Sequence, residues 1–231
     1  MNKTPENPLE GILLIDKPRG CTSFSLIPRL RKLSGIKKIG HCGTLDPFAT
    51  GVMVFLLGKS FTIKSDQFMS QDKEYIAKIR FGFATDTYDC EGKVTESSDK
   101  IPSFEELQSA LLTFQGEILQ KPPMFSAKKV QGKKLYELAR CGITIERKAS
   151  KVFLSTELVA YSYPYAMIRI QCSKGFYVRT FAHDLGQLLM APAHLAELTR
   201  TRVGTFHLAE CFAGDHLFDA SFMLKNHLRA V

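Results

Sequence analysis

The clearest pattern in the chain is a period of two in the apolar residues over 73–84 (KEYIAKIRFGFA). Lys78 and Arg80 stand between apolar neighbours. Because the side chains of a strand point alternately to its two faces, this pattern predicts a strand with one covered face. The apolar positions on that face are Tyr75, Ala77, Ile79, Phe81 and Phe83.

Several other segments also predict strands. Residues 11–16 (GILLID) and 52–58 (VMVFLLG) are short apolar runs bounded by turn-forming residues, which is typical of buried strands. Residues 152–162 and 166–172 predict two strands joined at 163–165. Residues 85–96 (TDTYDCEGKVTE) predict the turn of a hairpin that leads to a partner strand.

Helical spacing of apolar residues begins after the first strand. Leucine and isoleucine recur over 26–33, and Gly35 predicts the helix end. Ser25 as N-cap would place Pro28 in the first turn, where backbone N–H groups have no helical partner.

Three more helices are predicted further along the chain. Ser103 and Glu106 have capping-box spacing ahead of an apolar helix that ends near Gly116. A short helix follows residue 135 and is capped at Gly142, and a longer one covers 177–188. The pattern near the C-terminus, over 210–224, is weak.

The order of these elements indicates the fold class. Antiparallel-looking strands are interspersed with helices, without regular βαβ alternation or internal repeats, so an α+β fold is predicted. With 231 residues, 45% of them hydrophobic, the chain can build one large domain, alone or with a small appendage.

The composition of the chain indicates the kind of partner it binds and the compartment in which it works. The formal net charge of +8 favours a polyanionic partner, either nucleic acid or acidic lipid. The six cysteines show no metal-ligand spacing, so free thiols in a reducing compartment are expected. The chain start lacks a signal-peptide pattern, and no apolar run has the length of a membrane span. A soluble, cytoplasmic protein is therefore predicted.

Basic residues cluster in two segments. Residues 17–38 contain seven Lys or Arg and no acid, and residues 128–148 contain seven against two acids. A basic groove lined by both segments would bind phosphates. The alternative is that both segments are simply solvated loops.

The stretch 41–52 (HCGTLDPFATGV) places one carboxylate, Asp46, among glycines and threonines. The spacing does not match a Walker phosphate loop, and His41 and Asp46 are too few to bind a metal. Asp46 could simply close an Asx-turn. However, Pro47 restricts its backbone and the flanking glycines permit a close approach, as a nucleophile or general base at a strand mouth would require.

A second dense motif, 173–180 (SKGFYVRT), puts Tyr177 and Arg179 at a helix start. Arginine beside a partly buried carboxylate favours the ionised carboxylate. Taken alone, Arg179 could be a surface ion-pair residue. Tyr75 could be a core residue and His41 an ordinary loop residue.

Taken together, the segments GHCGTLDPFATGV, KEYIAKIRFGFATDT, PPMFSAKKVQGKKLYELAR and CSKGFYVRT resemble the TruB family, the tRNA pseudouridine-55 synthases. The match runs from GILLIDKPRG to PAHLAELTR, and GTLDPxATG is highly specific for the family. The resemblance implies the pseudouridine synthase fold, a mixed and mostly antiparallel sheet flanked by helices and loops. It also implies isomerisation of uridine 55 in the tRNA T-arm, without cofactor or metal, by a monomer.

The resemblance also implies roles for individual residues. Asp46 would be the essential nucleophile, although the sequence leaves open whether it attacks the sugar or the base, or removes a sugar proton. Arg179 would pair with Asp46, and Tyr75 would stack on the extruded base. The residues expected to contact the RNA substrate are His41, Tyr177, Leu198 and Lys17, with the two basic segments on its phosphates.

The sequence also departs from the family pattern. Cys42 stands where threonine is usual, Phe125 replaces a common tyrosine, and Thr199 replaces one of two arginines. A catalytic domain over 1–209 and a short tail over 210–231 are expected, without the complete C-terminal PUA domain of many members. The rival hypotheses are an RNA-folding chaperone on the same scaffold and a guide-RNA-dependent synthase.

Overall fold

The computed structural model describes residues 9–126, 128–130 and 132–229. The chain forms two compact units, the first from residues 1–73 and 199–231 and the second from residues 74–198. The prediction that no targeting segment is present concerns residues 1–8, which lie outside the described residues. The predicted division between 1–209 and 210–231 stays a prediction.

The first unit is built around two long neighbouring strands. β1 (Gly11–Lys17) pairs antiparallel with β3 (Thr50–Leu57), and both are buried along most of their length, as their apolar sequences predict. β2 (Ile39–His41) pairs with the second half of β3, and β14 (Phe212–Ala213) lies parallel to β1. β13 (Phe206–His207) forms a hairpin with the end of β12 (Ala193–Val203), which enters this unit from the second.

Short helices accompany these strands. The predicted first helix is confirmed as α1 (Ile27–Ser34), with proline in its first turn and Gly35 left-handed at its C-terminus. Ser25 as N-cap is wrong: its hydroxyl donates to the Thr22 carbonyl oxygen at 2.7 Å, so the chain turns once more before the helix begins. The others are α2 (Lys59–Thr62), α3 (Ser65–Met69), η1 (Leu208–Glu210), η2 (Gly214–Phe218) and η3 (Leu224–Asn226).

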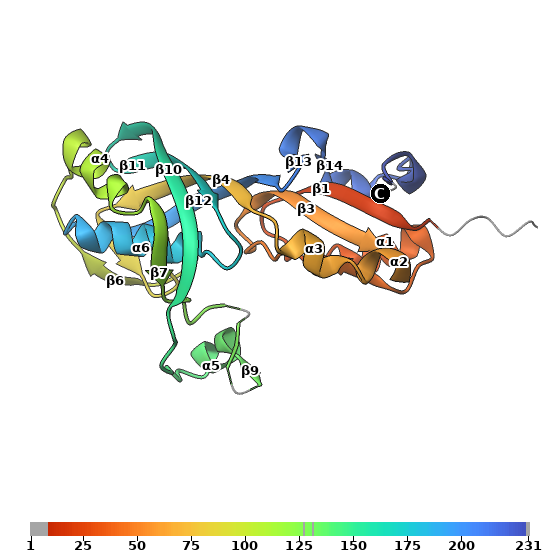
Figure 1. Cartoon of the computed structure of the whole chain (residues 1–231), viewed down its shortest axis with the longest axis horizontal. Helices are drawn as coiled ribbons and strands as arrows, with labels where there is room; N and C mark the ends of the chain where they lie inside the picture. The colour runs from red at the N-terminus through yellow and green to blue at the C-terminus, as the bar shows by residue number, and fades with distance from the viewer. Residues whose placement is uncertain (1–8, 127, 131, 230–231) are drawn as a thin grey trace, which may run out of the picture. The chain divides into compact units, whose positions relative to one another are not determined.

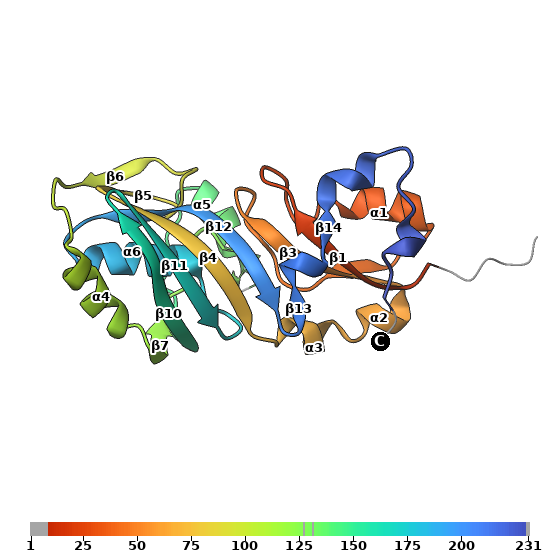
Figure 2. The same ribbon diagram turned by 90° about the horizontal axis from the view of Figure 1, so that it is seen from above.

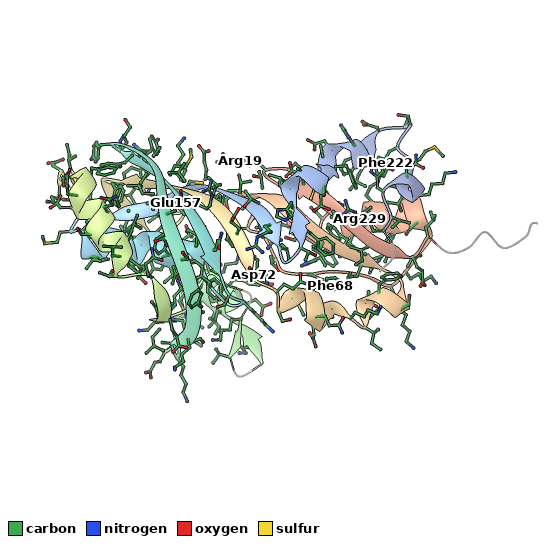
Figure 3. All side chains as sticks on the ribbon, turned by 45° about the horizontal axis from the view of Figure 1, so that its top comes forward. Arg19, Phe68, Asp72, Glu157, Phe222 and Arg229 are labelled. Carbon is green, nitrogen blue, oxygen red and sulfur yellow. The ribbon has the colours of Figure 1, made fainter. Side chains whose placement is uncertain are left out.

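The C-terminal segment, drawn in blue, returns to α1 within the first unit (Figure 2). Arg29 of α1 donates to the carbonyl oxygen of Leu217 at 2.6 Å. Phe222 stacks on His227 with ring centroids 5.0 Å apart, and Arg229 pairs with Glu210 at 2.6 Å (Figure 3). The weakly patterned terminus is therefore held by contacts within itself and by the bond from the distant Arg29.

The main sheet of the second unit runs in the order β4, β11, β10 and β7, with β12 beside β4 (Figures 1 and 2). Burial alternates along β4 (Lys73–Phe81), which confirms the predicted covered face. β10 (Ser150–Ser162) and β11 (Tyr165–Cys172) form the predicted antiparallel pair. β7 (Gly116–Gln120) and β12 were not among the predicted strands.

The predicted helices of the second unit are also present. α4 (Phe104–Leu112) begins with the capping box of Ser103 and Glu106. α6 (Val178–Leu188) lies along one side of the sheet (Figure 1), and α5 (Leu135–Arg140) precedes Gly142. The predicted hairpin pairs β5 (Phe83–Thr85) with β6 (Val94–Ser97), and β8 (Lys129–Val130) pairs with β9 (Lys133–Lys134).

The α+β class is confirmed. Most of the pairs described are antiparallel, whereas β1 with β14 and β3 with β12 pair in parallel. Across the part of the chain that the structure covers, no helix has the length and apolar character needed to cross a membrane.

Candidate active site

The loop between β2 and β3 carries Asp46, which is half-buried. The N–H of Leu45 donates to Ser23 Oγ at 2.9 Å, and the same hydroxyl donates back to the Leu45 carbonyl oxygen at 3.0 Å. On the other side, the N–H of Ala49 donates to the main-chain oxygen of Asp46 at 3.1 Å. The backbone is therefore fixed on both sides of Asp46.

Lys17 fixes the next residue of this loop. Its ammonium group donates to the carbonyl oxygens of Pro18, Cys21 and Pro47 at 2.9, 2.8 and 3.1 Å. Lys17 is fully buried, and burial lowers the pKa of its amine. These contacts correct the prediction that Lys17 binds an RNA phosphate, because its three donors are directed to protein carbonyls. Lys17 instead holds the loop that carries Asp46.

A second buried cation, Arg200 of β12, also contacts this loop. It is 1% exposed, and its guanidinium group donates to the carbonyl oxygens of Val52 at 2.8 Å and Gly43 at 3.2 Å. A Cβ on Gly51 would lie 2.2 Å from the Arg200 carbonyl oxygen, and Gly51 has a φ of 105°. Only glycine fits here, because both the space and the backbone conformation exclude a side chain.

Two further contacts fix the start of β3. Asp16 accepts from the N–H of Gly51 at 3.0 Å, and burial raises the pKa of the Asp16 carboxyl group. The hydroxyls of Thr50 and Thr199 lie 2.9 Å apart. Thr199, one of the departures from the family pattern, therefore has a structural partner in the strand that follows Asp46.

Cys42 and His41 stand at the start of the loop. Cys42 is buried in the apolar core of the first unit, and burial raises the pKa of its thiol to about 11. The replacement of the usual threonine by Cys42 therefore lies in the apolar core. His41 packs edge-on against Phe55, and burial together with the charge of Arg200 lowers its pKa. Its Nδ1 is buried and has no hydrogen-bond partner among the described residues.

In the second unit, Arg179 stands in the first turn of α6 and is 5% exposed. Its guanidinium group donates to the carbonyl oxygens of Thr87 at 3.1 Å and Phe125 at 2.7 Å, and its Nε lies 3.7 Å from Asp89 Oδ2. Phe125, a departure from the family pattern, accepts from Arg179 through its backbone carbonyl oxygen, not through its side chain. Asp89 was missed from the sequence, although it lies only two residues after Thr87, where the matched KEYIAKIRFGFATDT segment ends.

Tyr177 is held by a pair of hydrogen bonds. Its N–H donates to Gln120 Oε1 at 2.8 Å, and Gln120 Nε2 donates to its carbonyl oxygen at 3.0 Å. Gln120 ends β7, so this unpredicted strand sets the start of α6. Tyr75 of β4 and Leu198 of β12 are both buried, with exposed fractions of 9% and 6%.

The predicted site residues thus fall into two groups. Lys17, His41 and Asp46 lie in the first unit, and the others, Tyr75, Tyr177, Arg179 and Leu198, lie in the second. The predicted ion pair between Asp46 and Arg179 joins the two units and stays a prediction. The basic segments are divided in the same way, with 17–38 in the first unit and 128–148 in the second, and a groove lined by both stays a prediction.

Most cations of these basic segments are exposed. Arg29 and Arg147 are partly buried and donate to backbone carbonyls, Arg147 to Pro122 at 3.0 Å. The exposed cations are Arg19, Arg31, Lys32, Lys37, Lys38, Lys128, Lys133, Arg140 and Lys148. In the described parts of the chain, no group of three or more His, Cys, Asp or Glu is arranged to hold a metal ion.

Solved structures share this fold. A Cbf5–Nop10–Gar1 complex matches with a TM-score of 0.69 and 24% identity over 90% of this chain, and an H/ACA RNP bound to a substrate RNA containing 2′-deoxyuridine matches with 0.68 and 21% over 94%. This chain spans 54% and 58% of those chains.

Sequence relatives are more similar and match most of the chain. The tRNA pseudouridine synthase B of Protochlamydia amoebophila is 57% identical over 226 residues, covering 98% of this chain and 86% of the relative. That of Chlamydia muridarum is 54% identical, covering 96% and 92%.

Family models match both parts of the sequence. The model of the TruB family pseudouridylate synthase N-terminal domain covers residues 31–178, and that of the tRNA pseudouridylate synthase B C-terminal domain covers residues 179–231. The fold and these matches define a pseudouridine synthase. The chain belongs to the TruB family.

Proposed function

We propose that this enzyme isomerises uridine 55 in the T-arm of tRNA to pseudouridine, with Asp46 as the nucleophile. The relatives named tRNA pseudouridine synthase B, at 57% and 54% identity over nearly the whole chain, support tRNA as the substrate. The T-arm and position 55 follow from the GTLDPFATG motif and its family resemblance.

The main observation in support of the proposal is that hydrogen bonds fix the backbone of the loop on both sides of Asp46. Ser23 fixes the backbone before it, Lys17 holds the carbonyl oxygen of Pro47 after it, and Arg200 holds the loop at Gly43. A carboxylate that must meet one atom of a bound nucleotide needs such preorganisation, because displacements of about 1 Å can cost roughly 100-fold in rate.

The reaction is an isomerisation, and its atoms balance without an oxidant or a reductant. The bond from C1′ to N1 breaks, the uracil turns, and a bond from C1′ to C5 forms. The proton on C5 leaves, and N1 ends protonated. A carboxylate suits this chemistry because it can bond to a reacting carbon and leave again, or it can take a proton.

The other site residues would hold the base during these steps. A uridine in a folded loop must first be extruded, and the aromatic face of Tyr75 would then stack on it. Tyr177 would contact the uracil or assist the loss of the C5 proton. Arg179 would pair with Asp46 and keep it ionised.

The remaining contacts are to the RNA. His41 would hold flipped nucleotides of the loop, and Leu198 would pack against the substrate. The exposed cations of the two basic segments would bind phosphates. The enzyme would act in the cytoplasm as a monomer.

The test is to map pseudouridine in an unmodified tRNA transcript treated with this protein alone. Modification at position 55, and none in a matched transcript with cytidine there, supports the proposal. Tight binding of the transcript without pseudouridine would instead indicate the RNA-folding chaperone. Activity that requires an added guide RNA would indicate a guide-dependent enzyme.

A further inference from the structure

The loop of residues 86–92, between β5 and β6, holds Asp89 against Arg179 and is tightly folded. Asp89 Oδ1 accepts from Thr87 Oγ1 at 2.6 Å and from the N–H of Glu91 at 3.0 Å. A Cβ on Gly92 would lie 2.3 Å from Thr87 Oγ1. The loop therefore has little room to adjust.

Tyr88, the residue before Asp89, has a backbone conformation that tyrosine rarely adopts. Its φ is 64°, in the left-handed region where most non-glycine residues are strained. Such a conformation persists only where surrounding contacts enforce it. The backbone of Tyr88 is held by its carbonyl oxygen, which accepts from the N–H of Leu195 at 3.0 Å, and by its N–H, which donates to Thr85 at 3.2 Å.

The side chain of Tyr88 makes a further contact, with α6. Its ring stacks on the imidazole of His183 with centroids 4.0 Å apart and planes 11° apart. His183 follows Arg179 by four residues, so both side chains lie on the same face of the helix. Tyr88 thus contacts His183, and the next loop residue, Asp89, contacts Arg179 one turn earlier in α6.

The contact between Arg179 and Asp89 depends on this support. The Nε–Oδ2 distance of 3.7 Å exceeds the roughly 2.7–2.9 Å of a direct charge-assisted hydrogen bond. The loop supplies two contacts to the guanidinium group, the Asp89 carboxylate and the Thr87 carbonyl oxygen that accepts from it. A shift of the loop would move Thr87 and Asp89, while the Phe125 carbonyl oxygen, which also accepts from Arg179, lies outside the loop.

We propose that Tyr88 and His183 are positioning residues. Their ring stack holds the strained loop on α6, so that Thr87 and Asp89 orient the Arg179 guanidinium group for catalysis. This inference rests on the proposed function, since it concerns the efficiency of pseudouridine formation. Neither residue needs to touch the substrate.

The test compares variants of both residues for kcat, for tRNA Kd and for urea unfolding. Tyr88→Phe and His183→Phe retain a stacked ring and should keep kcat within about twofold of wild type. Tyr88→Ala and His183→Ala should lower kcat up to about tenfold, the worth of one aromatic pair, with little change in Kd. Tyr88→Gly removes the ring but relieves the strained φ, so it separates the stack from the backbone conformation.

The double variant gives the sharpest result. If the stack is the active feature, Tyr88→Ala with His183→Ala should lose no more activity than either single variant. Tyr165→Ala, which removes a half-exposed tyrosine from β11 of the same unit, is the matched control and should leave kcat unchanged.

Equal kcat for wild type and the alanine variants would overturn the inference, as would a loss for Tyr88→Phe as large as that for Tyr88→Ala. Should an alanine variant fail to fold, Tyr88→Gly and the phenylalanine variants decide by the same criteria. A wild-type protein that forms no pseudouridine at all would overturn the proposed function, and the inference with it.

Discussion

Replacing Lys17 by methionine tests whether this buried cation is structural. Methionine is an unbranched side chain one heavy atom shorter than lysine, and it removes the three N–H donors. The structure then predicts a loss of stability and of turnover, because the bond from Lys17 to Pro47 lies directly beside Asp46.

The magnitude follows from what the three carbonyl acceptors retain. Pro47 still accepts from the N–H of Gly20 at 2.8 Å, and Pro18 still accepts from the thiol of Cys21 at 3.4 Å. The carbonyl oxygen of Cys21, a half-buried residue, loses its bond to Lys17. An acceptor left unsatisfied in a fully buried position costs about 1–3 kcal/mol. Because the buried ammonium group no longer has to be desolvated, we expect a net loss at the lower end of that range.

Urea unfolding measures this free energy, and pseudouridine formation with saturating tRNA measures the effect on turnover. A shift of the Asp46 loop by about 1 Å should lower kcat roughly 10- to 100-fold while tRNA binding is retained. Lys225→Met, an exposed lysine of the same unit outside the two basic segments, is the matched control. Unchanged stability together with weaker tRNA binding and a smaller salt dependence would refute this reasoning and restore Lys17 as a phosphate ligand.

Further predictions concern backbone fit and pH. Gly51→Ala should destabilise the fold far more than Gly35→Ala in thermal unfolding, because both have positive φ but only Gly51 meets the Arg200 backbone. Burial lowers the pKa of His194, whose Nδ1 lies 3.0 Å from the Phe83 carbonyl oxygen. Between that lowered pKa and the usual 6.5 the unfolded chain binds more protons, so the free energy of unfolding should fall as the pH decreases. His194→Gln should reduce this slope in urea titrations at pH 7 and pH 5, and an unchanged slope would contradict it.

Local patterns predicted much of the fold. The alternation along β4 and the capping box of Ser103 and Glu106 depend on residues close in sequence, and both are present as predicted. β7 and β12 were missed because their pairing is set by distant residues. For example, Thr199 of β12 pairs with Thr50 of β3, and the two residues are about 150 positions apart in the sequence.

The candidate site shows the same limit. The motif pointed to Asp46, but the buried state of Lys17 depends on the carbonyl of Pro47, 30 residues away. Lys17 therefore looked like any other cation of a basic segment. Asp89 was read as part of a turn, because its contact with Arg179 joins residues 90 positions apart.

The central claim is that Asp46 performs the chemistry, and Asp46→Asn tests it most directly. Tritium release from tRNA labelled at C5 of uridine measures turnover, and a filter assay measures binding. We predict no release with tRNA binding preserved, and full release from Asp66→Asn, an exposed carboxylate on α3. Undiminished release from Asp46→Asn would contradict the account.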